Sequence, residues 1–119
     1  MVKYKIMEDE TVLVEGQTIK QLLSRWISME IAYINNQIAD GLETSVNTEE
    51  IGYDVIKQLK AYRTKLKDNE GQKQFDDILN ILDGWEVYAS LGLDIYCFNP
   101  KTQDYDNLTK VKGSGNNGK

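Results

Sequence analysis

The chain has no histidine and a single cysteine, and both scarcities exclude familiar kinds of chemistry. Without histidine there is no Ser–His or Cys–His base, and the commonest zinc ligand is also missing. One cysteine cannot complete a Cys/His metal cluster within the chain. The sequence does contain 19 Asp and Glu residues, so composition alone does not exclude a Mg²⁺ or Ca²⁺ site.

Long apolar runs are absent as well. No stretch approaches the roughly 20 residues that a membrane-spanning helix needs. The first residues, MVKYKIMEDE, lack the apolar core of a signal peptide. Cys97 cannot form a disulfide within the chain, and we expect it to be a buried, unreactive thiol in a strand. These features predict a cytoplasmic protein without membrane contact.

Arginine and proline are scarce: the sequence has two Arg against twelve Lys, and one Pro. Together with frequent Ile and Asn, this usage is typical of an AT-rich genome, such as that of a low-GC Gram-positive bacterium or its phages and plasmids. The nine glycines fit no phosphate-binding pattern of the GxGxxG or GxxxxGK[ST] kind. We therefore expect no cofactor.

The first part of the chain predicts a hairpin followed by a long helix. Alternating apolar and polar residues indicate a β-hairpin over residues 2–7 and 11–15. Thr18 with Gln21 three residues later forms a capping-box pattern, from which a helix runs to about Ile38 or Ala39. Its apolar arc is about 200° wide. We expect a central helix covered on more than one side, with a homodimer through this arc as a further possibility.

A second helix is predicted from a cap at Asn47, with Glu50 at the third helical position, to about Lys67. A narrow stripe of apolar residues at spacings of three and four supports it. Its members are Ile51, Val55, Leu59, Tyr62 and Leu66. The narrow stripe predicts that one side of this helix faces solvent.

The remaining pattern predicts a third helix and a small C-terminal hairpin. The helix is expected from about residue 72 to 90 or 91, with Gly84 as a weak point that costs about 1 kcal/mol relative to Ala. A strand over 93–98, a turn over 99–102 and a short returning strand over 103–108 follow.

These elements predict an α+β fold, in which a three-helix layer packs on a small antiparallel sheet. The sheet is built from the N-terminal hairpin and a C-terminal strand or hairpin. Residues 1–109 form one domain in this interpretation, and residues 110–119 form a disordered polar tail because of their GSGNNGK sequence. The alternative is a helical bundle with two detached hairpins.

The net charge is −5, and the acids concentrate around the third predicted helix. Residues 72–98 hold five acids against one Lys. A solvated helix face explains this plainly, whereas a negative patch that meets a basic partner or mimics nucleic acid is the sharper hypothesis. Its candidate contacts are Asp76, Asp77, Asp83 and Glu86. A cation site is disfavoured, because neighbouring helical residues point about 100° apart and no EF-hand pattern exists.

Three further residues depart from their local patterns and are candidates for protein interaction. Glu30 lies in the middle of the first helix's apolar arc, so it must pair, reach solvent or protonate. Tyr53 lies off the apolar stripe, and Tyr105 stands between two aspartates. Tyrosine combines contact area with a hydrogen-bonding tip, although single exposed aromatics are common in any protein.

Basic residues gather beside the stripe of the second helix: Lys57, Lys60, Arg63 and Lys67. They are candidate phosphate contacts. However, the chain has a pI near 4.7, so it lacks the excess of basic residues that electrostatic binding of nucleic acid requires. Two other interpretations are that these basic residues simply face solvent, or that they pair with acidic residues of the third helix. Nucleic acid is therefore a disfavoured partner.

The small size of the chain, its lack of recognisable catalytic groups and the uneven distribution of its Asp and Glu residues predict a non-enzymatic protein-interaction module. The sharpest version is a phage or mobile-element accessory protein that binds and inhibits a host protein, such as a defence nuclease, by occupying its nucleic-acid channel. The alternative is a dimeric regulatory or DNA-associated protein that uses the basic stripe. An enzyme using carboxylates and Mg²⁺ is a third hypothesis, but sequence spacing brings no pair of carboxylates together.

Overall fold

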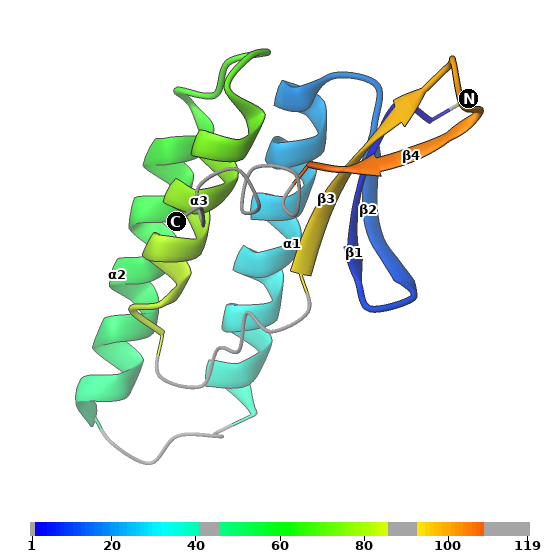
Figure 1. The fold of residues 1–119 in the computed structure, drawn as a ribbon. Helices are drawn as coiled ribbons and strands as arrows, with labels where there is room; N and C mark the ends of the chain where they lie inside the picture. Colours follow the sequence, from blue (N-terminus) through cyan, green and yellow to red (C-terminus); the bar gives the residue numbers. More distant parts are fainter. Residues whose placement is uncertain (1, 41–45, 86–92, 109–119) are drawn as a thin grey trace, which may run out of the picture.

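The computed structural model of the chain describes residues 2–40, 46–85 and 93–108. In chain order the elements are β1 (Tyr4–Glu8), β2 (Thr11–Gly16), α1 (Ile19–Ala39), α2 (Val46–Arg63), α3 (Gly71–Leu82), β3 (Leu93–Asn99) and β4 (Asp104–Asn107) (Figure 1). The predicted α+β fold is confirmed.

The four strands form one antiparallel sheet in the order β2-β1-β3-β4. Strand β1 pairs with β2 of its own hairpin and with β3 of the C-terminal hairpin, as Tyr4 lies opposite Gly16 on one side and Cys97 on the other. Because both ends of the chain share this sheet, the alternative of two detached hairpins is wrong. Cys97 is half-buried rather than fully buried, and its thiol lies 3.6 Å from the Phe98 carbonyl oxygen.

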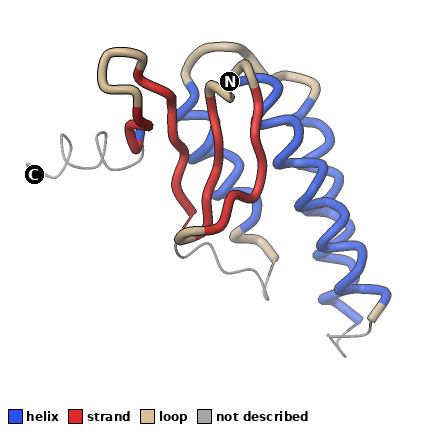
Figure 2. Tube along the Cα trace, turned by 90° about the vertical axis from the view of Figure 1, so that its right-hand side faces the viewer, coloured by secondary structure: helices blue, strands red, loops and turns tan. Residues whose placement is uncertain are grey.

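The helices cover one face of the sheet (Figure 2). Helix α1 packs against β1 and β2, and it also contacts α2 and α3. Ile6 and Ile95 of the sheet and Trp26 of α1 are completely buried in the shared core. The wide apolar arc of α1 is thus covered by elements of the same chain.

The start of α1 follows its local sequence signal. The Thr18 hydroxyl oxygen accepts a hydrogen bond from the Gln21 backbone N–H at 3.0 Å, as the capping pattern predicts. The Gln21 side chain reaches back to the backbone N–H of Gln17 at 2.7 Å, one residue before the expected position. The helix ends at Ala39, within the predicted range.

Helix α2 differs from its prediction at both ends. It begins at Val46, so Asn47 lies inside the helix rather than at its cap. It ends at Arg63, before the predicted Lys67. Leu66, the last member of the predicted stripe, is still buried, but it enters the core from the loop. The helical spacing of apolar residues continues past Arg63 in the sequence, whereas the backbone is no longer helical there.

Helix α3 is shorter than predicted. It begins at Gly71 and ends at Leu82. The backbone N–H groups of Gly84 and Trp85 bond carbonyls three residues back, at 3.1 and 2.9 Å, which closes a turn. The Trp85 side chain is buried in the core. Residues 90 and 91, the expected end of the helix, and residues 110–119, the expected polar tail, fall outside the described residues.

Candidate functional site

At one end of the molecule α1 and α3 end, α2 begins and the β1–β2 hairpin turns (Figure 1). Exposed carboxylates gather at this end. Five stretches form this end: residues 6–14, 26–40, 46–56, 78–85 and 93–95. Apart from the buried Glu30, the carboxylates of these stretches are exposed, except that of Asp94, which is half-buried. We call this region the acidic end, and its exposed or half-buried carboxylates are Glu8, Asp9, Glu10, Asp40, Glu49, Glu50, Asp54, Asp83 and Asp94.

No Lys or Arg occurs in the five stretches that make the acidic end. Every cation of the described residues lies toward the opposite end or on the outer part of the sheet. They are Lys3, Lys5, Lys20, Arg25, Lys57, Lys60, Arg63, Lys65, Lys67, Lys73 and Lys101. The charge is therefore separated along the molecule, and one end presents a negative potential without compensating cations.

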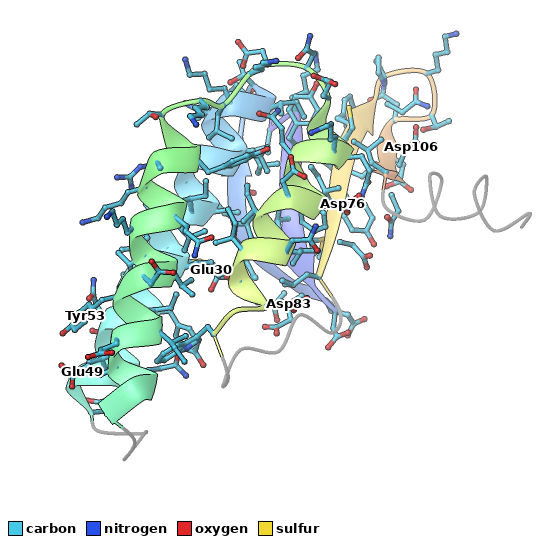
Figure 3. All side chains as sticks on the ribbon, turned by 90° about the vertical axis from the view of Figure 1, so that its left-hand side faces the viewer. Glu30, Glu49, Tyr53, Asp76, Asp83 and Asp106 are labelled. Atoms are coloured by element: carbon cyan, nitrogen blue, oxygen red, sulfur yellow. The ribbon has the colours of Figure 1, made fainter. Side chains whose placement is uncertain are left out.

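The same stretches carry the exposed large apolar side chains. Val12 is 42% exposed, Tyr33 52%, Ile51 38% and Tyr53 51%. Glu49 and Tyr53, one helical turn apart, project from the same side of α2 (Figure 3). Exposed carboxylates and exposed aromatic side chains therefore lie together at this end.

The predicted acidic candidates separate in the structure. Asp83 is exposed at the C-cap of α3 and belongs to the acidic end. Asp76 is exposed further up the same helix, where its Oδ1 accepts a hydrogen bond from Gln72 at 2.9 Å. Glu86 falls outside the described residues. Sequence proximity along one helix therefore does not make one patch.

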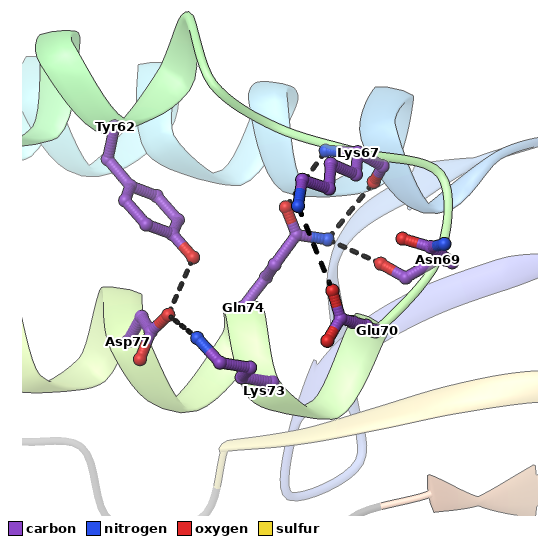
Figure 4. A network of polar contacts seen from close by, with 7 residues as sticks. All are labelled: Tyr62, Lys67, Asn69, Glu70, Lys73, Gln74 and Asp77. Carbon is purple, nitrogen blue, oxygen red and sulfur yellow. Dashed lines mark hydrogen bonds and ion pairs between the residues drawn. The ribbon is translucent and has the colours of Figure 1, made fainter.

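Asp77 is engaged within the fold (Figure 4). Its Oδ2 accepts hydrogen bonds from the Tyr62 hydroxyl at 2.8 Å and from Lys73 Nζ at 3.1 Å. The bond from Tyr62 holds the pKa of the Asp77 carboxyl below its usual value, and Lys73 adds to this effect. Desolvation raises the pKa of the Tyr62 hydroxyl, and Asp77 raises it further. These contacts tie α2 to α3.

Glu30 is 5% exposed, so the sequence signal of an acid within an apolar arc reflects real burial. Its Oε2 accepts a hydrogen bond from Trp26 Nε1 at 3.0 Å. Desolvation raises its pKa from 4.5 to about 6, the Trp26 bond lowers it, and the nearby charge of Glu8 raises it. Glu30 is therefore an interior group, and its contacts give it a structural role.

Tyr105 is also held by the fold. Its hydroxyl donates to the Val2 carbonyl oxygen at 2.6 Å, and its ring meets Phe98 edge to face at 5.4 Å between centroids. Lys5 Nζ lies 3.9 Å from the centre of the Tyr105 ring. These contacts join β4 to the start of β1. Its predicted role in protein interaction stays a prediction.

The basic stripe of α2 is only partly free of contacts. Lys57 and Lys60 are exposed. Arg63 donates to the Ser28 hydroxyl oxygen at 2.8 Å, which links α2 to α1. Lys67 Nζ lies 4.0 Å from a Glu70 carboxylate oxygen in the loop before α3. Two of the four candidate phosphate contacts thus have partners within the chain.

The part of the chain that the structure describes contains no group of three or more His, Cys, Asp or Glu side chains placed to hold a metal ion. Among the same residues, no helix is long and apolar enough to cross a membrane. No known family, curated protein or solved structure matches the chain.

Sequence reasoning located Asp83 and Tyr53 but missed most of the acidic end. The usable signal was the spacing of cations: no Lys or Arg occurs between Lys5 and Lys20, between Arg25 and Lys57, or between Lys73 and Lys101. Only the fold shows that parts of these three runs meet at one end.

Proposed function

We propose that the protein is a non-enzymatic binding module whose acidic end docks on a basic surface of another protein. The observation that supports this is the separation of charge: the acidic end has nine exposed or half-buried carboxylates and no cation in its stretches of chain. A surface of one sign accelerates encounter with an oppositely charged partner and rejects partners of like charge.

The apolar groups of the acidic end support a protein partner over a simple counterion. Tyrosine is enriched at protein interfaces, because it combines a large contact area with a polar tip. Tyr53 and Ile51 are exposed beside Glu49 and Glu50 on α2. A partner surface with Lys or Arg around an apolar centre complements this arrangement.

The partner class that fits best is a protein whose basic surface ordinarily holds nucleic acid. Carboxylates arrayed on a surface take the place of phosphates, so binding would block nucleic-acid access and inhibit the partner. The preference for Lys over Arg supports a low-GC Gram-positive host and an origin on a phage or mobile element. In this proposal the protein acts in the cytoplasm, and a defence nuclease is the sharpest candidate target.

The test compares three forms of the tagged protein as baits in nuclease-treated lysate of such a host, with the bound proteins identified by mass spectrometry. One is the wild type, and one neutralises the acidic end through Glu10→Gln, Glu50→Gln and Asp83→Asn. The matched control neutralises three carboxylates elsewhere, through Glu15→Gln, Glu70→Gln and Asp76→Asn. Both variants change the net charge equally, so only the position of the lost charge differs.

We expect one stoichiometric partner on the wild type and the control, and at least a tenfold loss of affinity for the acidic-end variant, which is about 1.4 kcal/mol. Duplex DNA should displace the partner. Equal loss in both variants would reduce the effect to net charge and contradict the proposal. Partners captured only when the nuclease is omitted, with direct DNA binding that weakens as salt rises, would support the alternative of a DNA-associated protein using Lys57 and Lys60.

A further inference from the structure

The two faces of the sheet have different surroundings. On the inner face, Ile6, Leu93 and Ile95 are buried against the helices. No element of the described residues covers the outer face (Figure 2). Because side chains alternate along each strand, the residues between these three project from the outer face.

When one face of an antiparallel sheet lies in water, the side chains on that face are usually polar. The outer face of this sheet also carries apolar and aromatic side chains. Met7 lies opposite Val12, and Phe98 lies opposite Tyr105. Tyr96 occupies the same face, opposite Lys5. None of these apolar side chains belongs to the core cluster, and Val12 is 42% exposed.

Contacts among these side chains hold the face in a defined shape. The Phe98 and Tyr105 rings meet edge to face, and Lys5 lies over the Tyr105 ring. The Tyr96 hydroxyl accepts a hydrogen bond from Asn107 Nδ2 at 3.2 Å. A surface whose side chains are already ordered loses little conformational entropy on binding, which favours its use as an interface.

Charge runs along the outer face in the direction of the strands. Lys3 and Lys5 lie where β1 begins, at the end away from the hairpin turn, and Glu15 of β2 lies opposite Lys5, so this end of the face has two cations and one carboxylate. Asp94, opposite Met7, lies at the other end, next to the acids of the hairpin turn. The face is therefore complementary to a copy of itself whose strands run in the opposite direction.

We propose that the outer face of the sheet packs against the same face of a second copy, with the strands of the two sheets antiparallel across a two-fold axis. This arrangement brings the Lys3 and Lys5 end of each copy over the Asp94 end of the other. If the strands of the two copies ran in the same direction, the Lys ends would meet each other and the Asp94 ends would meet each other. Two-fold symmetry would make each of these unfavourable contacts occur twice.

The size of the face limits the strength of this dimer. Four strands about 4.8 Å apart and about 17 Å long give a face of roughly 300 to 400 Å² per copy. That is below the roughly 1,200 Å² total of a stable interface, so the dimer should be weak and reversible. A dissociation constant in the micromolar range is expected.

Sedimentation equilibrium of the full chain up to about 500 μM, in about 50 mM salt, tests the proposal. We expect a monomer–dimer equilibrium that weakens several-fold in about 500 mM salt, because screening reduces the complementary attraction. Val12→Lys on the outer face should weaken the dimer about tenfold, because it sets a cation against Lys3 and Lys5 of the other copy. Ile51→Lys on α2 is the matched control, with similar exposure and the same charge change, and it should leave the dimer unchanged.

Charge reversal fixes the orientation. Lys3→Glu alone should weaken the dimer, and adding Asp94→Lys in the same chain should restore it at unchanged net charge. A monomer at every concentration in low salt overturns the proposal, as does a dimer that Val12→Lys leaves intact. A dimer that strengthens with salt, or that the double reversal fails to restore, contradicts the antiparallel arrangement. Circular dichroism of each variant confirms that a lost dimer is not a lost fold.

Discussion

The two ends of the helical layer hold their buried polar groups in different ways. At the end opposite the acidic end, Gln74 is 5% exposed and makes three hydrogen bonds to the backbone of the preceding loop (Figure 4). It accepts from the Lys67 N–H at 2.9 Å and donates to the carbonyl oxygens of Lys67 at 3.0 Å and Asn69 at 2.7 Å. This amide is neutral, and its partners lie within seven residues.

Toward the acidic end, the buried polar groups rely on tryptophan. Gln37 accepts a hydrogen bond from Trp85 Nε1 at 2.7 Å, across 48 residues of sequence. Glu30 accepts one from Trp26, whose ring stacks on Phe75 of α3 at 5.0 Å between centroids. One of these acceptors is a carboxylate near Glu8, so its environment opposes its charge. The polar interior at this end depends on pH and on long-range contacts, whereas the loop around Gln74 depends on neither.

The largest expected effect comes from breaking the Gln74 network. Gln74→Leu keeps similar volume but leaves three backbone groups without their partner, so the free energy of unfolding should fall by about 3 kcal/mol. Urea denaturation monitored by tryptophan fluorescence measures it. Gln58→Leu is the control, because its hydrogen bond to Asp54 is exposed, and its effect should stay within about 0.5 kcal/mol. Equal effects of the two variants would contradict the structural role of Gln74.

The charge of Glu30 should make stability depend on pH. Its pKa is raised from 4.5 to about 6, so the folded state binds more protons than the unfolded state between these values. The free energy of unfolding should therefore fall as pH rises through this window, by about 2 kcal/mol. In Glu30→Gln this contribution is absent. Urea denaturation of both proteins across the window measures the difference.

Trp26→Phe sharpens the same measurement. Its hydrogen bond lowers the pKa of Glu30, so removing the indole N–H should raise that pKa further and extend the pH-dependent window to higher pH. A purely steric effect of the substitution would lower stability equally at all pH values. If wild type and Glu30→Gln changed with pH in parallel, the interior charge would not be the source.

The elements that sequence predicted well are those set by local signals. The alternation of β1 and β2 and the Thr18–Gln21 cap of α1 involve neighbouring residues only, and all three appear where expected. The predicted helix ends that are wrong are those that contacts between residues distant in the sequence determine. The loop after Arg63 is fixed by the Gln74 side chain.

The short α3 has the same kind of cause. Apolar spacing beyond Leu82 predicts more helix, but Trp85 instead turns into the core and bonds Gln37 of α1. The candidate site shows this limit most clearly. The cation-free runs are visible in the sequence, yet only the antiparallel course of α1 and α2 and the return of β3 beside β1 bring them to one end.

The smallest expected effect concerns two glycines, one near each end. A Cβ at Gly52 would lie 2.6 Å from Trp85 Cζ3 and 2.9 Å from Ile38 Cδ1, whereas one at Gly71 would meet only the flexible Cδ1 of Ile19 closely, at 2.8 Å. Alanine gains about 1 kcal/mol of helix propensity at an interior position. A rigid ring cannot yield as a methyl terminus does, so Gly52→Ala should still destabilise by about 1 to 2 kcal/mol.

Gly71→Ala, by contrast, should stay within about 0.5 kcal/mol of wild type, because the Ile19 side chain can rotate away. Thermal or urea denaturation of the pair decides the comparison. A Gly52→Ala protein more stable than wild type would mean that helix propensity outweighs the contact, and that Trp85 is loosely packed. The dependence of the acidic end on its long-range Trp85 contact would then be weaker than the hydrogen bond to Gln37 implies.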